Sequence, residues 1–303
     1  MSSIAQYLLN GLMQGTIYGL VAIGFTIFFG VMNVIKFSHG DVLTFGAFGG
    51  LVAAWVATAL GFPIWLELVF VIVAAVMASA VIGAVIAQGL VLPLKDAPPL
   101  NMLLMTMMVG TAIRECIRLF FPNGTNPQKF PELLPSGGFD LSGIYFRYDG
   151  LILIAAGIAF IFLVQWIINR TRLGLAIRAV AEDGETARTM GINFTLTVVI
   201  AFAIGSMTAG VAGALYGLYY SEINYGMGLI LAIIGFSAAI VGGLGNIWGA
   251  IIGGYLFAGL QTAVVAFLPA LSDYKNVIAL IVVVALIAWR PTGLLAERGS
   301  ERV

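Results

Sequence analysis

Long apolar runs alternate with short polar connectors along almost the whole chain of 303 residues. A helix needs about 20 mostly apolar residues to cross the hydrocarbon core of a membrane. Nine runs approach that length, although the seventh and eighth are short. The pattern predicts one transmembrane domain over residues 1–303, with eight or nine spans near 9–31, 42–60, 65–92, 100–120, 151–169, 197–220, 228–243, 250–268 and 274–290.

Polar or Pro/Gly-rich connectors separate most of these runs. The stretch 121–150 is long enough to fold as a small external segment, and 170–194 carries many charges. Two junctions are ambiguous, because "NVIKFSHGD" (33–41) and "GGLGNIWG" (242–249) are compatible both with loops and with helix breaks inside the membrane. The number of spans depends on these two junctions.

The composition leads to the same class of protein. Hydrophobic residues make up 61% of the chain and charged residues only 9%, with a mean hydropathy of +1.05. A soluble domain carries about 25% charged residues, so this chain could not cover a water-exposed surface. We therefore expect an all-α polytopic membrane protein. The formal net charge of zero gives no reason to expect a nucleic-acid partner.

The distribution of basic residues predicts an orientation. If 170–194 is cytoplasmic, nine of the 14 Lys and Arg residues fall on the inner side of a nine-span arrangement. Inner loops of membrane proteins carry an excess of such residues. We expect a multi-pass protein of the cell (inner) membrane, with its N-terminus outside and its C-terminus in the cytoplasm.

Small residues recur at four-residue spacing, the pattern of close helix packing in membranes. Packing is the simpler interpretation, and sliding of helices during transport is the alternative. Gly40 before Gly49-Gly50 also resembles Gly245 before Gly253-Gly254, which hints at an internal repeat with broken helices. The candidate packing residues are Gly205, Ala209, Gly213, Gly217, Gly249 and Gly253.

Enzyme chemistry is not supported. The chain has one His and one Cys, so no metal cluster or catalytic pair is expected, and no GxxxxGK[ST] loop is present for ATP. We expect no catalytic residue, no metal and no cofactor bound by this chain. Arg114, Glu115 and Arg118 are interpreted as an anchor at a membrane interface.

Apolar and small residues also recur at helical spacing in the charged stretch 169–193, "NRTRLGLAIRAVAEDGETARTMGIN", which is expected to lie outside the membrane. Gly184 in its middle predicts two short helices with a turn. A short amphipathic helix needs a surface to lie on, and the acidic "AEDGE" disfavours an anionic lipid surface. A protein partner is therefore favoured over packing within the chain.

The segment 33–41 gathers ionisable residues between two apolar runs. Polar backbone at membrane depth is tolerated only where it is buried in protein or lines a cavity, and ionisable residues there mark functional sites. Asn33, Ser38, His39 and Asp41 are thus candidates for a translocation path or gate. The alternative is an ordinary inner loop, with Lys36 as an anchor and His39–Asp41 as a local hydrogen-bonded pair. We do not expect the His39–Asp41 pair to bind the charged ends of an amino acid.

Four motifs resemble a known family. "ETARTMG" (185–191) is similar to the EAAxxxG signature of ABC importer permeases, although the usual Ile-x-Leu-Pro is absent. The longer "RLGLAIRAVAEDGETARTMGIN" resembles the cytoplasmic loop of branched-chain amino acid permeases, a type II-like branch. "GVMNVIKFSHGDV" (30–42) resembles their Asn-Phe-Ala-His-Gly-Glu segment, with Lys36, Ser38 and Asp41 as departures. "VGGLGNIWGAIIGG" (241–254) and "RPTGLL" (290–295) resemble their later segments.

The resemblance implies a membrane subunit of an ATP-driven importer. Two ATPase subunits, which hold ATP and Mg, would dock on 174–191, and a second permease chain, usually different, would complete the path. An external binding protein would deliver a branched-chain amino acid. Alternatives are a permease for urea, amides or small acids, or an autonomous transporter or channel.

The candidate residues divide between docking and the path. Those for docking are Arg178, Glu182, Asp183, Glu185, Ala187 and Gly191. Those for the path or gate are Asn33, Ser38, His39, Gly40, Asp41, Gly242, Gly243, Gly245 and Asn246.

Overall fold

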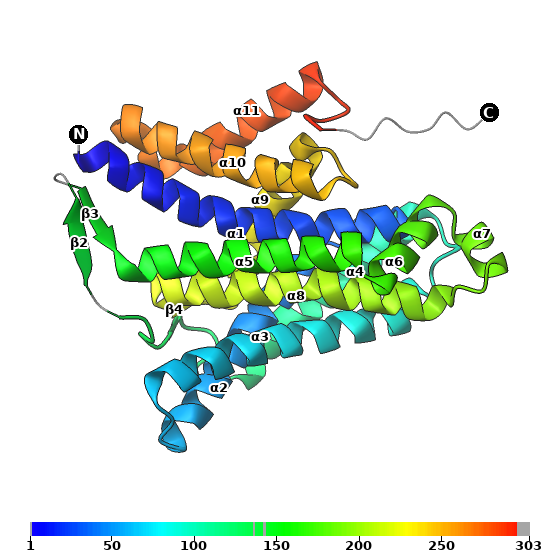
Figure 1. Ribbon diagram of the computed structural model, residues 1–303, viewed down its shortest axis with the longest axis horizontal. Helices are drawn as coiled ribbons and strands as arrows, with labels where there is room; N and C mark the ends of the chain where they lie inside the picture. The colour runs from blue at the N-terminus through cyan, green and yellow to red at the C-terminus, as the bar shows by residue number, and fades with distance from the viewer. Residues whose placement is uncertain (1, 136, 142–143, 296–303) are drawn as a thin grey trace.

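The computed structural model describes residues 2–135, 137–141 and 144–295, and helices make up most of this part (Figure 1). In the described residues, eight helical stretches are long and apolar enough to cross a membrane. Their helices are α1 (Ser2–Met32), α2 (His39–Ala59), α3 (Ile64–Ile86), α4 (Pro99–Phe120), α5 (Tyr148–Arg170), α8 (Phe194–Tyr220), α10 (Ile247–Phe267) and α11 (Lys275–Trp289).

A further apolar helix, α9 (Met227–Gly242), is shorter. Its 16 residues span about 24 Å, less than the roughly 30 Å of a hydrocarbon core. The α3 stretch is lengthened by a π-helical turn at Ala87–Val91, and α11 is preceded by a 3₁₀ turn at Pro269–Tyr274. The residue ranges can be compared with the expected spans. The spans expected at 9–31 and 274–290 correspond to α1 and α11, and the apolar run 228–243 corresponds to α9.

The core of the bundle lies around α1 and α8. Their most apolar windows are 83% and 78% buried, whereas the window that contains α11 is 11% buried. α1 packs against α8, α9 and α10, and α8 also packs against α2 and α3. Since these helices are apolar on every side, burial is decided by their place in the bundle and not by an amphipathic face. α11 crosses the outside of the bundle (Figure 1).

The two ends of the bundle carry different structures (Figure 1). At one end, α6 (Arg172–Glu182) and α7 (Gly184–Thr189) connect α5 to α8. At the opposite end, where α1 begins, β2 (Gly138–Leu141) and β3 (Ile144–Arg147) form an antiparallel hairpin. Within the expected external segment 121–150, the described residues include these two strands and β1 (Gln128–Lys129), and α5 begins at Tyr148.

A second strand pair fastens this segment to the bundle. β1 (Gln128–Lys129) pairs antiparallel with β4 (Glu222–Ile223), which directly follows α8. The next residue along, Phe130, is fully buried and its ring covers Gly217 of α8. A side chain at Gly217 would collide with that ring, so the absence of one makes this attachment possible.

Local sequence signals place several helix ends. α4 begins with Pro98 and Pro99, since proline lacks the N–H that the first helical turn leaves unbonded. The Asn193 side chain accepts a hydrogen bond from the Leu196 N–H (3.0 Å) at the start of α8. At the other end of α8, Ser221 adopts the left-handed conformation with φ of 55°. These signals fix the lengths of the spans that surround the site.

Candidate functional site

The chain turns back into the bundle after α1. Asn33 follows the end of α1 with φ of 52°, 34–36 have no regular secondary structure, and a turn at 37–38 leads into α2 at His39. His39 lies against Gly24 of α1, where a Cβ atom would collide with the imidazole. Gly24 precedes the end of α1 by eight residues, so α2 starts about 12 Å inward along that helix. The segment 33–41 therefore runs from the exposed Asn33 into the bundle, where Lys36 and 38–41 are buried.

Lys36 is the most deeply placed charge of this break. Its side chain is fully buried, and Nζ donates a hydrogen bond to Oγ of Ser206 (3.1 Å). Ser206 is the thirteenth of the 27 residues of α8, which puts the ammonium near the middle of that span. Nζ also lies 4.6 Å from the ring centre of Phe28 and 5.6 Å from that of Phe202. The inner-loop anchor considered for Lys36 does not fit this position.

Asp41 has a partner that the sequence did not indicate. Its Oδ1 accepts from Nε of Arg114 at 2.9 Å, and Oδ2 accepts from the same guanidinium at 3.4 Å. Gly110, one turn earlier on α4, leaves room for this carboxylate, because a Cβ there would collide with it. The predicted local His39–Asp41 pair is therefore wrong, and Arg114 pairs with Asp41 of α2 rather than with Glu115 beside it. Arg118 and Glu115 do pair with each other at the surface.

Two further polar side chains of the break are buried without partners. Neither Oγ of Ser38 nor either ring nitrogen of His39 has a hydrogen bond of normal geometry within the described residues, although the Val21 backbone interacts with the ring. The imidazole stands edge-on to the rings of Phe25 and Phe28, at 4.9 and 5.1 Å between centroids. Buried polar atoms are nearly always bonded, so each unbonded one indicates a missing partner.

The start of α2 is fixed by a close contact with α9. The backbones of Gly40 and Gly228 touch, and a side chain at either would meet the carbonyl oxygen of the other. Thr44 strengthens this crossing, since its Oγ1 donates to the Gly40 carbonyl (3.2 Å) and accepts from the Gly228 N–H (3.1 Å). Gly40 is thus required by the packing of two helix starts.

The second candidate break lies between α9 and α10. Gly243 and Gly245 adopt φ of 106° and 96°, which side chains disfavour, and Asn246 caps α10 through its bond from the Gly249 N–H (3.1 Å). The packing at this break is tight, because a side chain at Gly242 would meet the backbone of Gly249.

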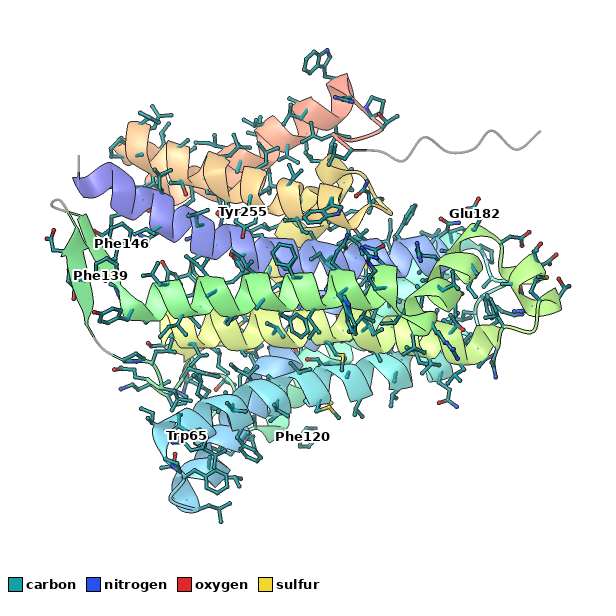
Figure 2. The ribbon with its side chains drawn as sticks, viewed as in Figure 1. Trp65, Phe120, Phe139, Phe146, Glu182 and Tyr255 are labelled. Atoms are coloured by element: carbon teal, nitrogen blue, oxygen red, sulfur yellow. The ribbon has the colours of Figure 1, made fainter. Side chains whose placement is uncertain are left out.

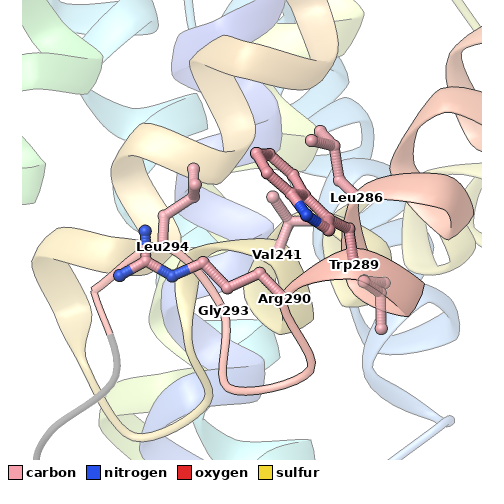
Figure 3. A pocket seen from close by; sticks show the side chains of 7 residues that line it. Val241, Leu286, Trp289, Arg290, Gly293 and Leu294 are labelled. Atoms are coloured by element: carbon pink, nitrogen blue, oxygen red, sulfur yellow. The ribbon is translucent and has the colours of Figure 1, made fainter.

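The segment 290–295, "RPTGLL", folds back onto this second break. The Leu294 and Leu295 N–H groups donate to the Val241 and Gly242 carbonyls at 2.7 and 3.0 Å. The Leu295 carbonyl in turn accepts from the Asn246 side chain at 3.0 Å. Figure 3 shows the turn, with the side chains of Trp289 and Arg290 beside a cavity of about 230 Å³. The end of α11 and the glycine-rich break therefore form one structural unit.

The expected helix pair is present in 170–194. Thr171 caps α6 by accepting from the Gly174 N–H (3.1 Å), and Asp183 caps α7 by accepting from the Glu185 N–H (2.9 Å). The chain breaks between the helices at Asp183, next to the predicted Gly184. The candidate docking residues differ in exposure: Ala187 is buried, whereas Arg178, Glu182, Asp183, Glu185 and Gly191 are exposed.

The helix pair lies beside both breaks. Asn33, Glu182 and Glu185 line one pocket of about 330 Å³. Arg178, Glu182 and Asn246 line a second pocket of about 560 Å³. Figure 2 shows Glu182 at this end of the bundle, opposite Phe139 and Phe146 of the β2–β3 hairpin. The structure therefore places the exposed helix pair next to the two segments that the sequence marked as a path or gate.

The small residues at four-residue spacing lie at close helix contacts. Beyond Gly217 and Gly249, described above, Ala209 is fully buried in α8. A Cβ at Gly205 would lie 2.5 Å from the Phe28 ring, and one at Gly213 would lie 2.5 Å from the Leu43 carbonyl oxygen. A side chain at Gly253 would meet the Ala238 carbonyl. Replacing these residues with larger ones would push neighbouring helices apart.

Comparison with known proteins supports a single family. The family model described as branched-chain amino acid transport system / permease component matches residues 7–287. The high-affinity branched-chain amino acid transport system permease protein BraD of Pseudomonas aeruginosa is 30% identical, over 98% of this chain and 97% of BraD. LivH of Escherichia coli strain K12, which carries the same description, is 28% identical over 98% and 97% of the two chains.

A solved structure, PsaBC from Streptococcus pneumoniae in complex with Fab, matches 97% of this chain and 94% of that one, with 14% identity and a TM-score of 0.48. The family assignment rests on the sequence matches, which cover nearly the full length. The chain belongs to the family of branched-chain amino acid transport system permease components.

Proposed function

We propose that this chain is the membrane-spanning permease subunit of an ATP-driven importer, and that it forms part of the translocation path for branched-chain amino acids. The observation that carries the proposal is the position of α6 and α7, which project from one end of the bundle and line pockets with both helix breaks. An autonomous carrier has no need of such an exposed helix pair.

Docking of an ATPase on α6 and α7 gives these helices a mechanical role. Arg178, Glu182, Asp183, Glu185 and Gly191 are exposed, while Ala187 is buried and holds α7 against the bundle. Movement of the helix pair would be transmitted to Asn33 and to Asn246, since both lie in pockets with Glu182. Such a movement needs a nucleotide that favours one state of the complex over the other.

The complex would contain further chains. Two ATPase subunits would hold ATP and Mg, so this chain would bind no cofactor itself. A second permease chain, usually different, would complete the path, and an external binding protein would deliver the amino acid. The chain would lie in the inner membrane with its N-terminus outside, so that α6, α7 and the C-terminus face the ATPases in the cytoplasm.

The docking proposal is tested by charge reversal on the helix pair. The double variant Glu182→Arg and Glu185→Arg, which keeps Asp183 as the cap of α7, should lose co-purification of the ATPases from native membranes. The matched control is Glu132→Arg with Glu222→Arg, two exposed carboxylates that lie outside the α6–α7 connection. The control should co-purify ATPases normally.

Membrane insertion and thermal unfolding of both variants show whether the fold is intact. If the α6–α7 variant is folded and retains its ATPases like the control, the exposed carboxylates of this helix pair are not the docking surface.

A further inference from the structure

The start of α2 contains an unusual concentration of buried hydrogen-bond donors. Lys36 has three N–H donors and uses one on Ser206. Ser38 and His39 are fully buried, with side-chain oxygen and nitrogen atoms that lack hydrogen bonds of normal geometry in the described part of the chain. Lys36 and His39 both lie against the ring of Phe28, so the two side chains are close neighbours. An ammonium can only donate, which favours an acceptor as the missing partner.

The charges of the break do not balance within the described residues. Asp41 is the nearest carboxylate in sequence, and both of its oxygens are occupied by Arg114. Lys36 contacts two aromatic rings and a hydroxyl, and no ion pair to it is found within the described ranges. A buried cation without an anion costs several kcal/mol. Lys36 is therefore a buried amine near mid-span with no acidic partner in the described ranges.

The helix itself adds to this positive field. The first turn of α2 is buried, and Ser38 at its N-cap makes no capping hydrogen bond with its side chain. A helix N-terminus carries a partial positive charge and free N–H groups, which suit an anion. In transporters, broken helices direct such N-termini at anionic groups of the substrate. Two independent features, the uncapped helix and the unpaired ammonium, thus indicate the same kind of ligand.

The surroundings of the donors are aromatic. Phe25 and Phe28 contact the imidazole, Phe202 stacks near Phe28 at 4.7 Å between centroids, and Phe236 lies 5.5 Å from Phe25. Such rings bind an apolar body and offer no partner to an ammonium group other than their faces. A ligand with one carboxylate and an apolar body has the chemistry that complements this combination of donors and rings.

We propose that Lys36, Ser38, His39 and the N-terminus of α2 form a transit site that binds the carboxylate of a small apolar acid, with its hydrocarbon part among Phe25, Phe28, Phe202 and Phe236. The site rests on the proposed function, because it lies on the path of a permease. In this structure it is closed, since Gly24 lies against His39 and Gly40 against Gly228. The ligand is admitted when α1 and α9 move apart from the start of α2.

The chemistry predicts an order of ligands. The site supplies donors for a carboxylate, whereas its one carboxylate is already paired with Arg114. Isocaproate, which is leucine without its ammonium, should bind at least as well as leucine. Isoamylamine, which is leucine without its carboxylate, should not bind.

The test is equilibrium binding of radiolabelled isocaproate to the purified full-length chain in detergent. Unlabelled leucine and isoamylamine are the competitors. Lys36→Met should weaken isocaproate binding about tenfold to hundredfold, the range expected for loss of hydrogen bonds to a charged group. Lys36→Arg keeps the charge and should retain part of the affinity. The control Lys129→Met removes a lysine that is 81% exposed and should bind like the native chain.

The outcomes separate this inference from the proposed function. Thermal unfolding of Lys36→Met shows that the variant is folded, and removal of an unpaired buried charge should leave it at least as stable as the native chain. The inference is overturned if the native chain does not bind isocaproate, if Lys36→Met binds it equally well, or if isoamylamine competes as well as leucine. If the native chain binds isocaproate but co-purifies no ATPase from its own membranes, the permease proposal alone is overturned.

Discussion

Arg114 should be a much stronger contributor to stability than its neighbour Arg118, one turn further along α4. Arg114→Met removes the partner of Asp41, whose side chain is 6% exposed, and leaves a buried carboxylate uncompensated. Breaking a buried ion pair on one side costs about 3–5 kcal/mol. Because the Arg114 side chain is itself 20% exposed, water can reach the carboxylate in part, and we expect a loss of about 3 kcal/mol.

The geometry supports this magnitude. The two charged groups are 2.9 Å apart, which corresponds to an attraction of about 6 kcal/mol at an effective dielectric constant of about 20. Desolvation of both groups offsets part of that attraction. The pair also joins α4 to α2, and α4 is only 22% buried, so few other contacts compensate for its loss.

The assay is the free energy of unfolding in mixed detergent micelles titrated with SDS. Arg118→Met is the control, because Arg118 and Glu115 are 38% and 41% exposed and such pairs contribute at most about 1 kcal/mol. The double variant Arg114→Met with Asp41→Asn removes the uncompensated charge and should recover part of the loss. If Arg114→Met costs no more than Arg118→Met, the pair is solvated and does not hold α4 in place.

Two further variants test other contacts. Gly213→Ala should lower the free energy of unfolding by about 1–3 kcal/mol, because the new Cβ would lie 2.5 Å from the Leu43 carbonyl oxygen. The control Gly259→Ala, in α10 with open space around it, should be neutral or stabilising. Equal unfolding of both variants in SDS would contradict the close packing of α8 on α2. Asp183→Ala removes the cap of α7 and should speed hydrogen exchange of the amides of 184–189. Asp183→Ser keeps a side chain that can cap the helix and should retain slow exchange. Equally fast exchange in both variants would show that the cap does not hold α7.

The sequence was informative about elements whose signals are local. Apolar length located the spans, and Gly184 with the acidic residues around it indicated two helices where α6 and α7 are found. The motif 33–41 was singled out because it interrupts an apolar run, but the sequence left open whether it is an inner loop or a break inside the membrane. Its depth of about 12 Å inside the bundle was not predictable, since depth depends on where His39 packs against Gly24.

Pairings between distant residues were beyond sequence reasoning. Arg114 and Asp41 are 73 residues apart, and Lys36 and Ser206 are 170 apart. Helices that are apolar all round show no face from which neighbours can be inferred. The sequence contained one indication of such a distant contact. Lys36 has no acidic residue three or four positions away, so any partner had to come from another part of the chain. The internal repeat suggested by the glycines around Gly40 and Gly245 stays a prediction.

The most direct test of the proposed function is transport by the native complex. The tagged chain is purified from its own membranes in mild detergent, its co-purifying chains are identified by mass spectrometry, and the complex is reconstituted into liposomes for uptake of labelled leucine. The account predicts two ATPase subunits and a second permease chain, and uptake that needs both ATP and an external binding protein. A chain that purifies alone and moves leucine down its gradient without ATP would contradict the account.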